Sequence, residues 1–186
     1  MQPIFLIMGT PASGKSTVAK ALMQRFERGL HIPVDDLRHL VVAGLSDMAF
    51  EIPPETFRQL RLAREAACVM ARMYADEGFA VAIDDFWLGE TPDEDYNQKI
   101  SRRVTRVLLL PNLETTLERL HARKPDEGSF KQILEQAIRS LQTSIEAHPK
   151  TGWLVIDSSD LSVEQTVDQI VESKDKLENK VVKSSP

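Results

Sequence analysis

The sequence has few of the residues that mark secreted, membrane-spanning or metal-rich proteins. Its 186 residues include one cysteine, Cys68, so no internal disulfide can form. The apolar run near the N-terminus is too short to span a membrane, and no basic segment of a signal peptide precedes it. Together these absences predict a protein of the reducing cytoplasm with no membrane anchor.

Basic blocks and zinc-ligand patterns are also missing. The formal net charge is −5, and the absence of a long basic stretch disfavours a general nucleic-acid-binding protein. The four histidines do not have the spacing of zinc ligands. Apolar residues make up 42% and charged residues 27%, which is typical of a globular domain. We predict a single domain over residues 1–173, followed by a polar tail over residues 174–186.

Short apolar runs alternate with amphipathic segments along the chain. The predicted strands cover residues 4–8, 31–34, 79–83, 104–110 and 153–156. The first predicted helix follows the loop after residue 8 and ends at Gly29, and the others lie at about 37–43, 54–77, 93–100, 113–120, 133–145 and 163–171. Pro33 favours an edge position for the second strand. This alternation predicts an α/β fold, a five-stranded parallel sheet with helices on both faces.

The loop after the first strand has the spacing G-x-x-x-x-G-K-S, which in a strand–loop–helix setting is the P-loop. Its amides and the start of the next helix form a cradle for phosphate oxygens. Lys15 is expected to reach the β- and γ-phosphates as a catalytic residue, and the Ser16 hydroxyl to hold Mg²⁺. The predicted ATP-binding residues are Gly9, Thr10, Pro11, Ala12, Ser13, Gly14, Lys15, Ser16 and Thr17. The fold class is therefore a three-layer P-loop NTPase.

The reaction class follows from which other motifs are present. The Asn-Lys-x-Asp and Asp-x-x-Gly motifs of GTPases do not occur, and the chain is small for a motor ATPase or helicase. A small kinase remains, which transfers the γ-phosphoryl group of Mg-ATP to a small-molecule acceptor.

Two pairs of aspartates follow predicted strands, at the edge where parallel α/β sheets bind ligands. After the second strand, we expect Asp35 to be the general base and Asp36 to contact the acceptor or cap the next helix. After the third strand, we expect Asp84 to hold Mg²⁺ and Asp85 to contact the acceptor. A solvated strand end is the simpler interpretation of either pair.

The basic segment between two predicted helices is a candidate lid near residues 121–130. Arg119 and Arg123 lie four residues apart and share one helix face. Closure of the lid would bring an arginine to the phosphates and exclude water, and we favour Arg123 as the catalytic one. The alternative is a basic helix end that interacts with the helix dipole.

Other basic and aromatic residues leave alternatives open. Arg38 is a candidate substrate-binding residue. Arg58, Arg61 and Arg64 form a row that either lines an acidic acceptor site or is a solvated helix face. Trp87, next to Phe86, either stacks on a flat acceptor or belongs to the core.

Three stretches together, GTPASGKS, PVDDL and AIDDFWLGE, resemble the chloramphenicol phosphotransferase-like P-loop kinases over roughly the first 90 residues. The resemblance implies an adenylate-kinase-like core that uses Mg-ATP to phosphorylate an alcohol, with Asp35 as the base. Zeta-toxin-like kinases and nucleotide kinases share the aspartate-rich second strand and the lid. The alternatives are therefore a nucleoside or nucleoside monophosphate kinase, with arginines for an acceptor phosphate, and a non-catalytic ATP-binding regulator.

Overall fold

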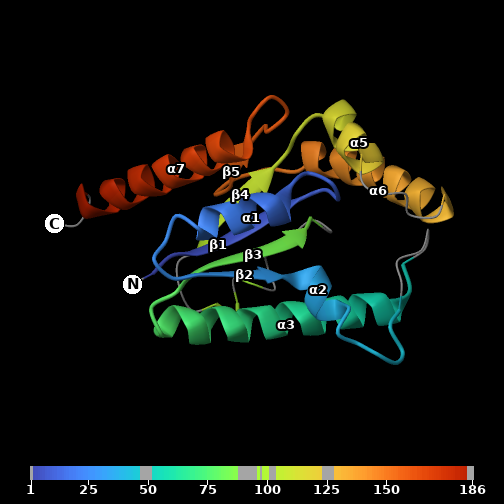
Figure 1. The fold of residues 1–186 in the computed structure, drawn as a ribbon, viewed down its shortest axis with the longest axis horizontal. Helices are drawn as coiled ribbons and strands as arrows, with labels where there is room; N and C mark the ends of the chain where they lie inside the picture. Colours follow the sequence, from blue (N-terminus) through green and yellow to red (C-terminus); the bar gives the residue numbers. More distant parts are fainter. Residues whose placement is uncertain are drawn as a thin grey trace.

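The computed structural model describes residues 2–46, 52–87, 96, 98–100, 104–122 and 128–183, with backbone only for 128–130 and 174–183. Strands and helices alternate along the chain (Figure 1). The strands are β1 (Ile4–Gly9), β2 (Gly29–Pro33), β3 (Ala80–Phe86), β4 (Val104–Leu109) and β5 (Leu154–Ile156). The helices are α1 (Lys15–Met23), α2 (Val34–Arg38), α3 (Pro54–Asp76), α5 (Leu113–Ala122), α6 (Gly128–Ala147) and α7 (Val163–Lys183).

The five strands form one sheet in the order β2-β3-β1-β4-β5, and every neighbouring pair is parallel. Parallel pairing requires a crossover between neighbours, and helices supply these crossovers. The predicted α/β fold is confirmed, and the edge position that Pro33 favours for the second strand is confirmed as well.

Side chains of β1 alternate between two hydrophobic cores. Ile4, Leu6 and Met8 face α3, whereas Phe5 and Ile7 face α1 and α7. In Figure 1, α7 lies above the strands, α3 below them and α1 in front of them, with α5 and α6 beyond the carboxyl ends of the strands. A third, smaller core joins α5 and α6 to the loop after β1. Because both faces are covered, the central strand β1 is apolar throughout rather than alternating with polar residues.

The first helix ends earlier than its predicted end at Gly29. Helix α1 ends at Met23, and Gly29 instead begins β2, paired with Ala80 of β3. The second strand is therefore Gly29–Pro33 rather than residues 31–34, and α2 begins at once with Val34.

These shifted boundaries change where the two aspartate pairs lie. Asp35 and Asp36 occupy the first turn of α2, and no side chain in the described part of the chain caps this helix. Asp84 and Asp85 lie inside β3, which continues to Phe86. Helix α7 also continues to Lys183, through most of the stretch predicted to be a tail.

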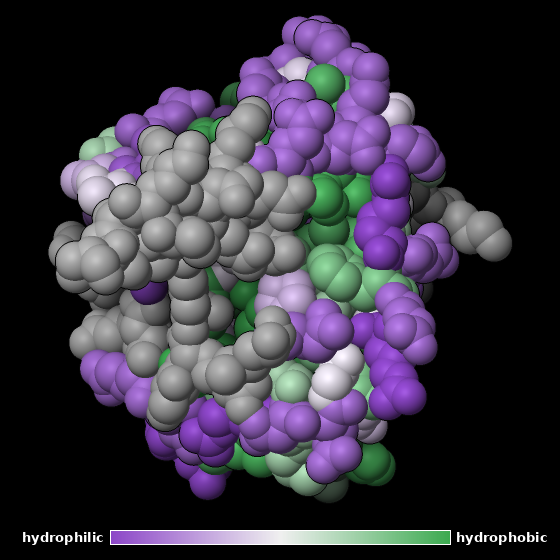
Figure 2. All heavy atoms as spheres, turned by 90° about the vertical axis from the view of Figure 1, so that its left-hand side faces the viewer, coloured by the Kyte–Doolittle hydropathy of each residue, from purple (hydrophilic) through white to green (hydrophobic). Residues whose placement is uncertain are grey.

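The described residues on the face drawn in Figure 2 are largely hydrophilic. On the side of the molecule opposite α5 and α6, hydrophobic residues show mainly in the middle and along the lower edge (Figure 2). Among the described helices, none combines the length and apolarity that a membrane span requires.

Candidate active site

The loop between β1 and α1 holds an unusual backbone that brings it close to the neighbouring strand. Ala12 and Gly14 have φ of 62° and 96°, in the left-handed region that side chains other than glycine rarely adopt. A Cβ on Gly9 would lie 2.5 Å from the carbonyl oxygen of Leu109 and 2.7 Å from Ser13 Oγ. Glycine at position 9 therefore lets the loop start close against β4. The left-handed backbone of Ala12 is strained, and backbone strain clusters at ligand sites.

Polar groups of this loop are available for a ligand. Lys15 Nζ donates to the carbonyl oxygen of Thr10 at 2.8 Å, so the side chain folds back over the loop. Thr10 Oγ1 and Ser13 Oγ are buried without a hydrogen-bond partner in the described part of the chain. The first turn of α1 carries no acidic side chain, so its amides keep their partial positive charge. The arrangement suits an anion such as a phosphate chain.

A carboxylate and a hydroxyl meet where α1 begins. Ser16 Oγ donates to Asp84 Oδ1 at 3.3 Å, which brings together the two residues predicted to hold Mg²⁺. Asp84 is only 6% exposed, so few water molecules reach its carboxylate. Mg²⁺ prefers oxygen ligands and usually takes one or two from protein and the rest from phosphate and water. This donor set therefore fits Mg²⁺ bound together with a nucleotide.

Asp85 points to the opposite face of the sheet, because successive side chains of a strand alternate. Its carboxylate accepts hydrogen bonds from Arg64 Nε at 2.7 Å, Tyr96 Oη at 2.9 Å and the Phe86 amide at 2.8 Å. The side chain is fully buried. Burial raises the pKa of Asp85, while Arg64 opposes the shift. The fold therefore separates Asp84, beside α1, from Asp85, beneath α3.

Asp35 remains accessible at the start of α2. Its side chain is 55% exposed, and Arg38 Nε donates to Oδ1 at 3.3 Å. Arg38 itself is buried, with Nη1 donating to the Ser46 carbonyl oxygen at 2.8 Å and Nη2 at 3.1 Å from His39 Nε2. Arg38 thus orients Asp35 and anchors the chain after α2, and Asp36 is exposed beside them.

Arg119 is the lid-side arginine that the structure places against the phosphate-binding loop. Its Nη1 donates to the Ser13 carbonyl oxygen at 3.3 Å, and its Nη2 to the Ser158 carbonyl oxygen at 2.7 Å. Arg123, the preferred residue on sequence grounds, lies outside the described residues, as do all of residues 123–127 of the predicted lid. Spacing on one helix face pointed to both arginines, and the contact of Arg119 with the Ser158 carbonyl depends on the path of the loop after β5, which no local pattern predicts.

The row of arginines on α3 divides into two environments. Arg58 pairs with Glu55 at 3.0 Å and Arg61 with Glu65 at 2.9 Å, and both side chains are more than half exposed. Arg64 instead points inward to Asp85. The sequence pattern of the row did not separate the solvated arginines from the buried one.

Trp87 belongs to the core. It is 1% exposed, and its ring lies 5.1 Å from that of Trp153, between centroids. Its amide donates to the Gly9 carbonyl oxygen at 3.3 Å, so this residue connects the end of β3 to the start of the phosphate-binding loop.

Solved structures resemble this chain over nearly its whole length. A sugar kinase from Janibacter sp. HTCC2649 has a TM-score of 0.65 at 18% identity, covering 94% of this chain and 92% of its own. The tunicamycin resistance protein of Deinococcus radiodurans has a TM-score of 0.64 at 18% identity, with 93% and 95% covered. A gluconokinase from Sinorhizobium meliloti 1021 has a TM-score of 0.64 at 17% identity, with 99% and 98% covered. At these identities the likeness establishes a shared fold.

No curated protein matches the sequence. The family model AAA_33, described as an AAA domain, matches residues 4–148, which include the phosphate-binding loop, both aspartate pairs and Arg119. The chain therefore belongs to the AAA_33 family of AAA domains and has a P-loop fold.

Proposed function

We propose that this protein is an ATP-dependent kinase that transfers the γ-phosphoryl group of Mg-ATP to a hydroxyl group of a small molecule. The observation that carries the proposal is the meeting of Ser16 with Asp84 at the start of α1, beside a loop whose buried hydroxyls have no partner among the described residues. The accessible carboxylate of Asp35 follows β2, at the same carboxyl edge of the sheet.

The phosphate chain of ATP would lie in the loop over residues 9–17. Lys15 would exchange its bond to the Thr10 carbonyl for the β- and γ-phosphates, and the amides at the start of α1 would bind the remaining oxygens. Ser16 and Asp84 would hold Mg²⁺, which neutralises charge on the phosphates when it is bound.

The acceptor hydroxyl would be oriented by Asp35, which accepts its proton as the bond to phosphorus forms. The transition state of phosphoryl transfer is loose, so position matters more than the strength of the base. The bond from Arg38 fixes Oδ1, and Oδ2, which lies 3.7 Å from His39 Nδ1, would accept the proton of the hydroxyl. Asp36 is a second candidate contact to the acceptor, whereas Asp85 is held in the core by Arg64 and Tyr96.

Exclusion of water completes the proposed mechanism, because hydrolysis competes with transfer. Arg119 already contacts the loop and would stabilise charge on the phosphates from the α5 side. Arg123, one turn further along, is the second candidate for this role.

An alcohol acceptor is favoured over a nucleoside monophosphate. A second phosphate would need cationic side chains, but Arg38, Arg58 and Arg61 already contact Asp35, Glu55 and Glu65. The names of similar structures, sugar kinase, gluconokinase and shikimate kinase, refer to acceptors that carry hydroxyl groups. The resemblance to chloramphenicol phosphotransferase-like kinases points the same way.

Replacement of Asp35 tests the proposal. The purified protein is supplied with Mg-ATP and a panel of sugars, hydroxy acids, nucleosides and nucleoside monophosphates, and ADP release is measured. For the acceptor that the parent uses, Asp35→Asn should lower transfer by about 100-fold or more and leave ATP affinity unchanged. Asp168→Asn, which breaks the exposed pair with Arg25, is the matched control and should retain full activity. Full transfer by Asp35→Asn would remove this residue from the mechanism, and ATP binding without any transfer would favour a regulator.

A further inference from the structure

A histidine on the edge strand β2 occupies one of the two oxygens of Asp84. The imidazole Nε2 of His31 is hydrogen-bonded to Asp84 Oδ2, while Ser16 Oγ bonds to Oδ1. The His31 and Asp84 side chains are 10% and 8% exposed, so water has little access to this contact. A carboxylate that binds a cation only accepts hydrogen bonds, so the tautomer with the proton on Nε2 is the one that makes this bond beside a bound ion.

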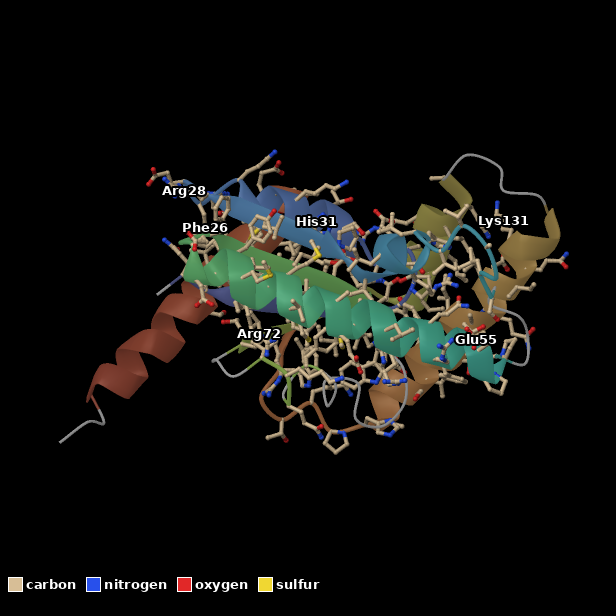
Figure 3. The ribbon with its side chains drawn as sticks, turned by 90° about the horizontal axis from the view of Figure 1, so that it is seen from below. Phe26, Arg28, His31, Glu55, Arg72 and Lys131 are labelled. Atoms are coloured by element: carbon tan, nitrogen blue, oxygen red, sulfur yellow. The ribbon has the colours of Figure 1, made fainter. Side chains whose placement is uncertain are left out.

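Strand register explains why these residues meet. His31 is paired with Ala82 in β3, and Asp84 lies two residues further along the same strand. Residues two apart point to the same face of a sheet, and Ala82 faces the core beneath α1. His31 therefore reaches Asp84 diagonally across the strands on the α1 side, and Figure 3 shows it on β2.

We infer that His31 is a positioning residue that sets the preference of the metal site for Mg²⁺ over Ca²⁺. The inference rests on the proposed function, since it concerns the ion that would accompany ATP. With Oδ2 bonded to His31, Asp84 offers only Oδ1 on the side of Ser16. A carboxylate restricted to one oxygen suits the small octahedral Mg²⁺, whereas Ca²⁺ accepts more ligands and often takes both oxygens of a carboxylate.

Hydrogen bonds to ligating carboxylates commonly tune metal sites in this way, and their loss typically changes metal affinity by about 10–100-fold. Without the donor at position 31, Oδ2 is free to turn toward the ion. Binding of Ca²⁺ should then improve relative to that of Mg²⁺, because the carboxylate can chelate with both oxygens.

The test compares nucleotide binding with the two ions. Titration calorimetry at one fixed pH gives the dissociation constant of ATP with Mg²⁺, with Ca²⁺ and with a chelator. Scanning calorimetry at the same pH gives the melting temperature of each variant. His31→Leu and His31→Val remove the donor, and valine also suits an edge strand. His31→Gln keeps an N–H donor near the Nε2 position. His148→Leu is the matched control, since this histidine bonds to the Ser144 carbonyl on α6.

The preference for Mg²⁺ over Ca²⁺ should fall about tenfold or more in His31→Leu and His31→Val. It should persist in His31→Gln and His148→Leu, and binding of metal-free ATP should not change. An unchanged ratio in both His31→Leu and His31→Val would overturn the inference, because a residue that only packs would lower the melting temperature without altering the ratio. Failure of the proposed function is distinguishable, since the parent protein would then bind ATP no more tightly with Mg²⁺ than without it.

Discussion

The buried ion pair between Arg64 and Asp85 makes a quantitative prediction about stability. Replacement of Arg64 by methionine keeps a long flexible side chain on α3 but removes the guanidinium that donates to Asp85 Oδ2 at 2.7 Å. The Asp85 side chain is fully buried, so water cannot take the place of the lost donor. Tyr96 and the Phe86 amide still donate to the carboxylate, but neither carries a charge.

Breaking a buried pair from one side costs about 3–5 kcal/mol, because the remaining charge is left uncompensated. In a domain of this size each kcal/mol lowers the melting temperature by about 2–4 °C. Arg64→Met should therefore lower it by about 6–20 °C near neutral pH.

The cost should depend on pH in a defined direction. Burial already raises the pKa of Asp85 in the parent, and loss of Arg64 should raise it further. Between the unfolded and the folded pKa, the folded state binds more protons than the unfolded state, so stability increases as the pH falls. The destabilisation by Arg64→Met is therefore largest above the folded pKa and shrinks as the pH falls toward the ordinary aspartate value.

Urea unfolding followed by circular dichroism, at a series of pH values, measures the loss of unfolding free energy in Arg64→Met and its dependence on pH. Arg61→Met is the matched control, since Arg61 lies one turn away on α3 but pairs with Glu65 at the surface, and it should cost less than about 0.5 kcal/mol. The double variant Arg64→Met with Asp85→Leu should recover stability relative to Arg64→Met alone. A cost below about 1 kcal/mol for Arg64→Met, or a cost that does not vary with pH, would contradict the expectation that the variant leaves the Asp85 charge buried without a counter-charge.

Two further predictions concern the phosphate-binding loop. Gly9→Ala places a Cβ 2.5 Å from the Leu109 carbonyl oxygen, so we expect the free energy of unfolding to fall by about 1–3 kcal/mol. Calorimetry should also show much weaker ATP binding, and an unchanged affinity for ATP would contradict the close approach of the loop to β4. Arg119→Met removes the bonds to the carbonyls of Ser13 and Ser158, so the dissociation constant for ATP should rise about tenfold or more, and an equal constant would mean that Arg119 only packs.

The parts of the fold that depend on local pattern could be predicted from the sequence. The apolar run before Gly9 and the G-x-x-x-x-G-K-S spacing together predict the strand, the loop and the helix that follow one another in the structure. The acidic ends of the predicted second and third strands placed the candidate site at the carboxyl edge of the sheet, where Ser16 and Asp84 lie in hydrogen-bond contact. The strand order and the ends of α1 and β2 depend on contacts between distant segments, such as that of Gly29 with Ala80, and no local pattern encodes them.

The different environments of neighbouring residues were harder to predict. Asp84 and Asp85 differ because alternation along β3 turns one toward Ser16 and the other toward Arg64. The sequence does not show which helix covers which face of the sheet. The predicted roles of Asp84 and Asp85 therefore depended only on their nearness to the end of the strand. His31 carried no motif at all, and its contact with Asp84 follows solely from the register of β2 against β3.

Calorimetric titration of ATP in the presence of Mg²⁺ tests whether the loop after β1 binds a phosphate chain with the help of Lys15. We expect the parent to bind ATP and Lys15→Ala to weaken binding at least about tenfold, while Lys20→Ala, on the exposed side of the same helix, binds as the parent does. Equal affinity in the Lys15→Ala variant and the parent would contradict this role of the loop and of Lys15.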